Sequence, residues 1–263
     1  MLKLYHGANS VCSIKVRIVL EEKRLDWESL HIDLPKGEQF SPEFVAINSR
    51  SFVPVLNHGG VILRESSVIC EYLDQLSDYN PLMPSDPALQ AITRIWGTQC
   101  LEYHDSVNTL TFASYQRTML LQKSKEELAA RWAAMPDQIR AQKVKDLVEK
   151  GGESAYVPVA LARMSRLAQE IDEALGDKPY LMGDDYSLAD ALITSYIFRT
   201  ECVGLAGLWE AHYPNTTNWY NRIKERASFG GAINPWLNEQ EMAKIRAAGE
   251  NTFLAQNKFS QYL

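Results

Sequence analysis

Three residues with a hydroxyl or a thiol group stand close together near the start of the chain, at Ser10, Cys12 and Ser13. The apolar spacing that follows predicts a helix over 11–23, so all three lie at or beside its amino-terminal end. A helix amino terminus favours negative charge, which lowers the pKa of a thiol and suits a hydroxyl that donates to an anion. These residues are therefore candidates for contact with an anionic group at this helix start.

A second polar pair, Glu65 and Ser66, stands at the start of another predicted helix, over 66–77. The serine hydroxyl and the first amides of that helix suit a carboxylate, and the glutamate suits an ammonium group. The same pair would also serve as an ordinary helix cap. The four cysteines are widely spaced without a Cys-x-x-Cys motif, so the sequence predicts neither a metal site nor a disulfide framework.

The elements that carry these residues are short and alternate along the first part of the chain. Alternating and apolar runs predict four strands and three helices, the second helix opening at Ser41-Pro42-Glu43. The strands are expected at 2–5, 28–32, 53–56 and 61–63. The order β-α-β-α-β-β-α predicts a thioredoxin-like α/β domain, in which helices cover a mixed sheet.

The rest of the chain is expected to be an all-α domain. Three prolines within 80–87 exclude a continuous helix there and predict a linker between the two domains. Beyond it the apolar spacing is helical. Ser187 and Asp190 predict a helix cap and are interpreted as structural. A charged segment near 122–156 is expected to border a pocket or to support assembly.

Composition excludes several classes of function. The chain has 263 residues and a formal net charge of −6, which argues against nucleic acid as a partner. No apolar run is long enough to span a membrane, and the start lacks a signal-peptide core. We therefore expect no membrane association and a reducing, cytoplasmic location.

Three motifs, at 52–56, 64–73 and 187–190, together resemble the glutathione transferase superfamily. The resemblance covers nearly the whole chain. It implies a thioredoxin-like glutathione-binding domain at 1–80 and an all-α substrate-binding domain at 88–263. It also implies glutathione as the co-substrate, a small aromatic electrophile as the partner, and a homodimer.

The resemblance assigns residues to glutathione. Pro54 would be cis and expose the main chain of Val53, with which the cysteinyl part of glutathione pairs like an added strand. Glu65 and Ser66 would bind the γ-glutamyl group. Two polar residues beside the second helix fit the glycine end by position, although surface polar residues are common: Gln39 and Arg50.

Within the superfamily, the sequence looks most like bacterial lignin β-etherases of the LigF type, on segments 47–50, 65–73 and 135–138. In that type an Asn-Ser pair precedes Leu-Lys in the first helix, and here Cys12-Ser13 precedes Ile14-Lys15 without a gap. By this resemblance Ser13 is the first candidate for the residue that hydrogen-bonds the glutathione sulfur. A competing register, closer to theta-like transferases, selects Ser10.

Cys12 is the departure from that pattern. A cysteine here could form a mixed disulfide with glutathione, as in omega- and beta-like members, which would imply thiol transfer or deglutathionylation. It could equally be a small buried cysteine that packs under the helix. The candidate catalytic residues are therefore Ser13, Ser10 and Cys12. No metal is required, because glutathione supplies its own sulfur.

The β-etherase resemblance implies that the glutathione thiolate displaces a phenolate from the carbon of a β-aryl ether beside an aryl ketone. Two alternatives stay open: another transferase or Cys12-dependent thiol-transferase activity, and a non-catalytic interaction protein on the same fold. The electrophile would face the first long helix. That helix carries side chains that could stack on an aromatic substrate or belong to the core, among them Trp96, Tyr103, His104, Val107, Phe112 and Tyr115.

Overall fold

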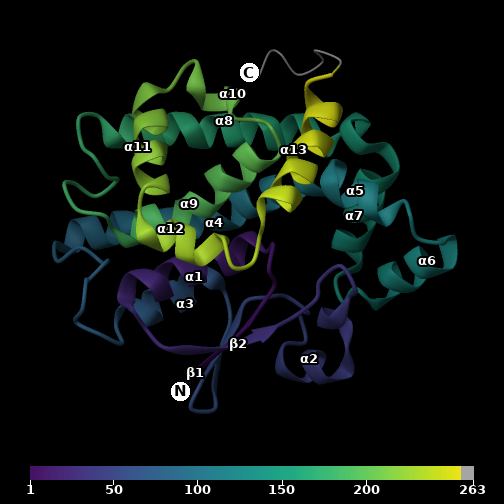
Figure 1. The fold of residues 1–263 in the computed structure, drawn as a ribbon, viewed down its shortest axis with the longest axis horizontal. Helices are drawn as coiled ribbons and strands as arrows, with labels where there is room; N and C mark the ends of the chain where they lie inside the picture. The colour runs from purple at the N-terminus through teal and green to yellow at the C-terminus, as the bar shows by residue number, and fades with distance from the viewer. Residues whose placement is uncertain (256–263) are drawn as a thin grey trace.

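The computed structural model describes residues 1–255, in which a small sheet lies against a larger assembly of helices (Figure 1). The four strands have the order β2-β1-β3-β4; β1 is parallel to β2, and the pairs β1–β3 and β3–β4 are antiparallel. The elements of this first part are β1 (Leu2–His6), α1 (Val11–Lys23), β2 (Trp27–His31), η1 (Glu38–Phe40), α2 (Pro42–Ile47), β3 (Val55–His58), β4 (Val61–Leu63) and α3 (Ser66–Asp74). The predicted thioredoxin-like α/β fold is confirmed.

Local sequence signals set most of these boundaries. Helix α1 has the predicted bounds, and α2 begins at Pro42 with Ser41 as its cap, whose hydroxyl accepts from the Phe44 amide at 3.2 Å. Strand β3 begins at Val55, two residues later than predicted. The Val53–Pro54 peptide bond before it is cis, as the resemblance implied.

Helices form the second part of the chain, which confirms its predicted all-α character over the described residues. They are α4 (Pro87–Ala113), α5 (Tyr115–Leu120), α6 (Lys125–Ala134), α7 (Gln138–Lys150), η2 (Gly151–Glu153), α8 (Tyr156–Leu175), α9 (Leu188–Cys202), α10 (Gly207–Glu210), α11 (Pro214–Lys224), α12 (Ala227–Ile233) and α13 (Glu239–Phe253). The segment between α3 and α4 contains no helix or strand. No helix within residues 1–255 combines the length and apolar character needed to cross a bilayer.

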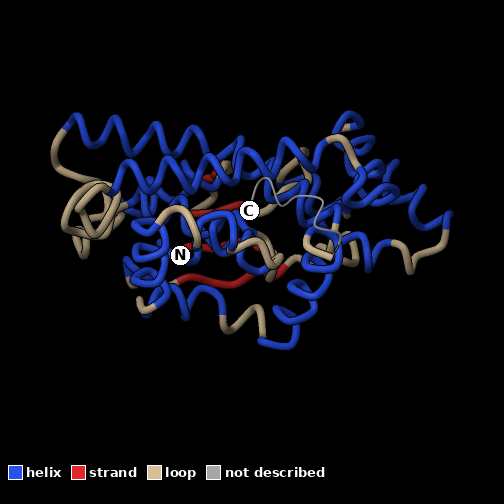
Figure 2. Tube along the Cα trace, turned by 90° about the horizontal axis from the view of Figure 1, so that it is seen from above, coloured by secondary structure: helices blue, strands red, loops and turns tan. Residues whose placement is uncertain are grey.

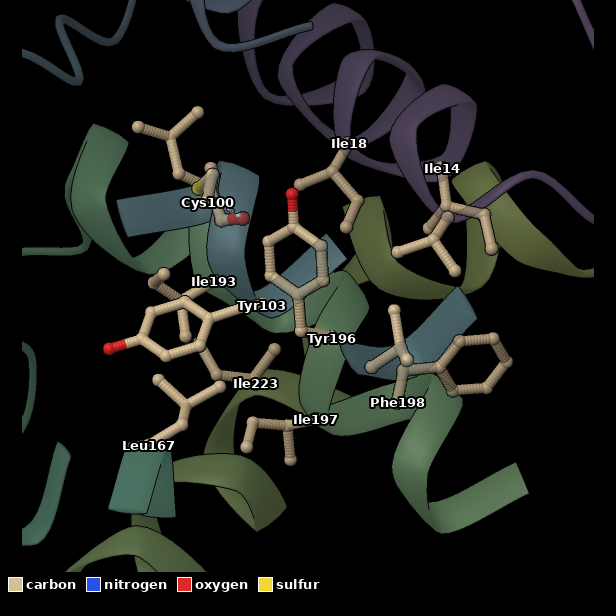
Figure 3. Close-up of a cluster of buried hydrophobic side chains, with 14 of the residues drawn as sticks. Ile14, Ile18, Cys100, Tyr103, Leu167, Ile193, Tyr196, Ile197, Phe198 and Ile223 are labelled. Atoms are coloured by element: carbon tan, nitrogen blue, oxygen red, sulfur yellow. Dashed lines mark hydrogen bonds between the residues drawn. The ribbon is translucent and has the colours of Figure 1, made fainter. Parts of the chain in front are cut away.

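One hydrophobic core runs through both parts. Ile14 and Ile18 of α1 pack in the same cluster as Tyr103 of α4 and Tyr196 and Ile197 of α9, with side chains that converge (Figure 3). Seen from above, the strands occupy one part of the molecule and helices account for most of the rest (Figure 2). The sheet and the helical assembly therefore share buried surface, which fixes α1 relative to α4 and α9.

Asp190 anchors the amino-terminal end of α9. Its buried carboxylate accepts hydrogen bonds from the Ser187 and Leu181 amides, both at 2.9 Å, and from the Trp219 indole at 2.8 Å. Burial, the largest influence, raises the pKa of Asp190, although these donors act to lower it. The structural capping role predicted for Ser187 and Asp190 is confirmed.

A buried cluster joins the sheet to the segment after α12. Arg17 donates to the Ala232 carbonyl at 2.7 Å and lies 3.1 Å from His6 Nδ1, and Trp236 packs edge-on against the His6 ring. On its other side, His6 Nε2 lies 2.8 Å from the Ser29 hydroxyl. Burial first, then the charge of Arg17, lowers the pKa of His6 to about 3, so this imidazole is neutral in the folded protein.

Candidate active site

A cavity of about 770 Å³ lies where the amino-terminal ends of α1 and α3 meet α4 and α7. The sheet side contributes α1, α3 and the loop before β3, and the helical side contributes α4, α7 and α9. The cavity is thus enclosed by both parts of the chain. Its size and its mixture of apolar and charged walls are those of a small-molecule site.

Five of the residues assigned to glutathione by resemblance line this cavity: Arg50, Val53, Pro54, Glu65 and Ser66. Glu65 and Ser66 stand at the amino-terminal end of α3, where helix amides favour a carboxylate. Glu65 has a φ of 65°, which is uncommon for a residue other than glycine and concentrates at ligand sites. Its carboxylate pairs with Arg50 at 2.8 Å.

Gln39, the sixth, is not brought to the cavity. It lies in η1 and is buried, and its Oε1 has no hydrogen-bond partner within the described residues.

The two serines at the start of α1 also face away from the cavity lining. Ser13 is fully buried, and its hydroxyl accepts a hydrogen bond from the Gly7 amide at 3.3 Å. Ser10 is the helix cap, and its hydroxyl accepts from the Ser13 amide at 3.3 Å. Both hydroxyls thus accept from backbone amides at the loop and the helix start, and the choice of the residue that contacts the glutathione sulfur stays a prediction.

Cys12 is the residue of this group that lines the cavity. Its Sγ lies 3.4 Å from Nδ1 of His104, which projects from α4 on the opposite wall. Burial acts to raise the pKa of Cys12, but the charge and hydrogen bond of His104, helped by Lys15 and Ser66, outweigh it. Together they lower that pKa to about 6, so the thiol is largely a thiolate at neutral pH.

Lys15 is a functional residue that the sequence interpretation missed. Its side chain is fully buried one helical turn after Cys12 and donates to the Tyr196 hydroxyl at 2.9 Å and to the Ser67 hydroxyl at 3.2 Å. Among the described residues no carboxylate pairs with it, so its charge acts on the neighbouring thiol. The available signal was a lysine flanked directly by apolar residues, Ile14 and Val16, in α1.

The aromatic face of α4 does not line the cavity. Trp96, Tyr103 and Val107 are buried in the hydrophobic core instead. The cavity face of α4 is displaced by about one residue and is made mainly of smaller and polar side chains, at Gly97, Leu101, His104 and Asn108. The core needs the large aromatic side chains, so their presence did not mark the substrate side.

Comparison with known proteins agrees with this architecture. The sequence model described as the Glutathione S-transferase N-terminal domain matches residues 9–76, and that of the C-terminal domain matches residues 128–227. Protein LigF of Sphingobium sp. (strain NBRC 103272 / SYK-6) is 33% identical over 201 residues, which span 72% of this chain and 75% of LigF. The chain belongs to the glutathione S-transferase family, and glutathione is its co-substrate.

Other relatives carry different names. The tetrachloro-p-hydroquinone reductive dehalogenase of Sphingobium chlorophenolicum is 28% identical over 235 residues, 87% of this chain and 94% of that protein. The crystal structure of the β-etherase LigF superposes with a TM-score of 0.80 at 27% identity, covering 89% of this chain and 99% of LigF. A glutathione transferase homologue from Sulfitobacter, solved with bound glutathione, gives a TM-score of 0.63 at 25% identity, covering 89% and 98%.

Proposed function

We propose that this chain is a glutathione-dependent thiol transferase in which Cys12 is the nucleophile. The observation that carries the proposal is the Cys12–His104 pair, a low-pKa thiol that faces the cavity 3.4 Å from an imidazole. A thiolate is the reactive form of cysteine, and a pKa near 6 keeps it populated at neutral pH. The serine candidates are supported less well, because neither Ser10 nor Ser13 lines the cavity.

Glutathione is proposed to lie along the sheet side of the cavity. Its γ-glutamyl carboxylate would meet the first amides of α3 and the Ser66 hydroxyl, and its ammonium would meet Glu65. The cysteinyl part would pair with the main chain of Val53, and its glycine end would extend toward Arg50. This order directs the glutathione sulfur toward Cys12.

The reaction is a pair of thiol–disulfide exchanges. The Cys12 thiolate attacks the glutathione sulfur of a glutathione mixed disulfide; this forms a Cys12–glutathione disulfide and releases the other thiol as a thiolate. A glutathione thiolate then attacks the glutathione sulfur of that disulfide, which releases oxidised glutathione and restores the Cys12 thiolate. His104 holds the thiolate and can protonate a leaving thiolate.

The test is turnover of the mixed disulfide of glutathione and 2-mercaptoethanol, with Cys12→Ser compared with wild type and with Cys202→Ser as a matched control. Cys202 is buried in α9 outside the cavity lining. We expect loss of turnover only in Cys12→Ser, and glutathione bound to Cys12 in the intact mass of the wild type. Equal turnover in both variants would refute the proposal.

A second function, cleavage of β-aryl ethers of lignin-derived aromatic ketones, is favoured by the likeness to LigF in sequence and structure. In that case the glutathione thiolate displaces the phenolate, and the Cys12–His104 pair stabilises the sulfur or protonates the leaving group. Free phenol released from a β-aryl ether ketone with glutathione would support it. The likeness to a reductive dehalogenase makes a chlorinated hydroquinone the comparison substrate.

We further propose a homodimer in a reducing, cytoplasmic compartment. Apolar side chains are exposed on β4, α3 and α4, notably Val61, Val68, Ile92 and Ile95, and such a surface suits a second copy. All four cysteines are free, as expected where glutathione is reduced. Light scattering should give twice the monomer mass, and Ile95→Glu should reduce it. Retention on immobilised glutathione tests the alternative of a non-catalytic protein that lost the site.

A further inference from the structure

The charged segment near 122–156 brings one arginine into the cavity. Helices α6 and α7 lie at the right of Figure 1, and α2 lies lower on the same side of the view. Arg140 of α7 lines the cavity wall, and its guanidinium carbon lies 4.8 Å from the centre of the Phe52 ring. Phe52 directly precedes Val53, the residue proposed to pair with glutathione. Arg140 therefore stands beside the expected glutathione site but on the opposite wall.

Arg140 has no carboxylate partner within residues 1–255, although two acids lie close to it. Asp105 is engaged by Lys143 at 2.7 Å, and Asp137 caps α7 by accepting from the Arg140 backbone amide at 3.0 Å. The Arg140 residue is half-buried, and burial, the largest influence, lowers its pKa. A half-buried guanidinium without a carboxylate partner is available to bind an anion.

The other arginines of the cavity differ in this respect. Arg50 pairs with Glu65 and Arg94 with Glu71, each at 2.8 Å, and Arg64 is exposed to solvent. The Arg140 guanidinium lies against the Phe52 ring, and its planar fork carries paired donors. A planar fork of this kind matches a carboxylate in a bidentate arrangement.

We propose that Arg140 binds a carboxylate of the second substrate. The enzyme would then prefer substrates in which the group joined to the glutathione sulfur carries a carboxylate. This rests on the proposed placement of glutathione. Arg50 comes from the sheet side and is closest in the chain to the glycine end, whereas Arg140 shares its wall with His104 and Asn108 of α4. The carboxylate would therefore belong to the group beyond the glutathione sulfur.

The test measures binding, so that it does not depend on Cys12 chemistry. Three ligands are compared. Two are stable thioethers, S-(4-carboxybenzyl)glutathione and the same compound with its benzoate group as the methyl ester. The third is unmodified glutathione. Dissociation constants are measured by calorimetry for wild type, Arg140→Gln, Arg140→Lys and Arg131→Gln. Arg131 of α6 is a matched control. Its guanidinium carbon lies 5.7 Å from the centre of the Phe40 ring, but Arg131 does not line the cavity.

We expect wild type and Arg131→Gln to bind the acid about 10- to 100-fold more tightly than the ester, as a charge-assisted pair implies. Arg140→Gln should remove this preference and leave glutathione binding unchanged, and Arg140→Lys should retain part of it. Equal affinity of wild type for acid and ester would overturn the proposal. So would weaker binding of unmodified glutathione by Arg140→Gln, which would assign Arg140 to the glycine carboxylate.

The result also separates this inference from the proposed function. A preference for the acid without Cys12-dependent turnover would support the Arg140 site and refute the thiol-transferase mechanism. Cys12-dependent turnover without any preference for the acid would do the reverse. Failure of all three ligands to bind would overturn both, because each places glutathione in this cavity.

Discussion

Replacing His104 by Asn removes the imidazole that lies 3.4 Å from the Cys12 sulfur and leaves an uncharged amide in its place. His104 is the largest influence that lowers the pKa of Cys12, from an ordinary value of 9.0 to about 6. At pH 7 a pKa of 6 leaves roughly nine-tenths of the thiol ionised, against about one-hundredth for a pKa of 9. Because burial acts in the opposite direction, the variant's pKa should rise toward or above its ordinary value.

Alkylation of Cys12 by iodoacetamide, followed by mass spectrometry of its peptide across pH 4–10, measures this pKa. In the wild type the rate should rise with pH through a midpoint near 6 and then level off. His104→Asn should move the midpoint upward and slow alkylation at pH 7 by about 10- to 100-fold. Cys70 is an internal control, because burial raises the pKa of its thiol. An unchanged midpoint in the variant would refute the pairing.

Two further predictions concern stability. Asp190→Ala leaves the Leu181 amide and the Trp219 indole without their acceptor and should lower the free energy of unfolding by about 3–5 kcal/mol. Asp185→Ala, at an exposed position, should lower it little. Urea denaturation of both variants measures the difference. His6 has a folded pKa of about 3 against an ordinary 6.5, so the unfolded chain binds more protons between these values and stability falls as pH falls below 6.5. This fall should reach about 2 kcal/mol at pH 5 and be absent from His6→Gln, and an equal pH dependence in both proteins would contradict it.

The sequence was sufficient for the fold because its signals are local. The apolar spacing of α1, the cap at Ser41 and the Ser187–Asp190 box each act within a few residues, and each reappears in the structure. The Val53-Pro54 and Glu65-Ser66 motifs are local in the same way, and both line the cavity. The predicted bounds that differ do so by a few residues: β3 begins at Val55 instead of 53, β2 spans Trp27–His31 instead of 28–32, and α3 ends at Asp74 instead of 77.

The rest of the site depends on contacts that no local pattern records. Cys12 and His104 are 92 positions apart, and only the packing of α1 against α4 brings them together. The charged segment near 122–156 was expected to border a pocket or to support assembly, but its pattern did not single out Arg140, which lines the cavity from α7. The aromatic residues of α4 were uninformative for the opposite reason, because a core and a substrate pocket use the same residue types.

Resemblance and geometry differ most at the start of α1, where one residue changes the expected chemistry. Successive residues of a helix point about 100° apart, and of Cys12 and Ser13 only Cys12 lines the cavity. The Ser13 hydroxyl turns to the Gly7 amide and the Cys12 sulfur turns to His104. The LigF-type resemblance leads us to expect asparagine at the position of Cys12, and an amide cannot attack a disulfide. The departure from the expected pattern therefore falls on a side chain that lines the cavity, which supports the proposed covalent sulfur chemistry.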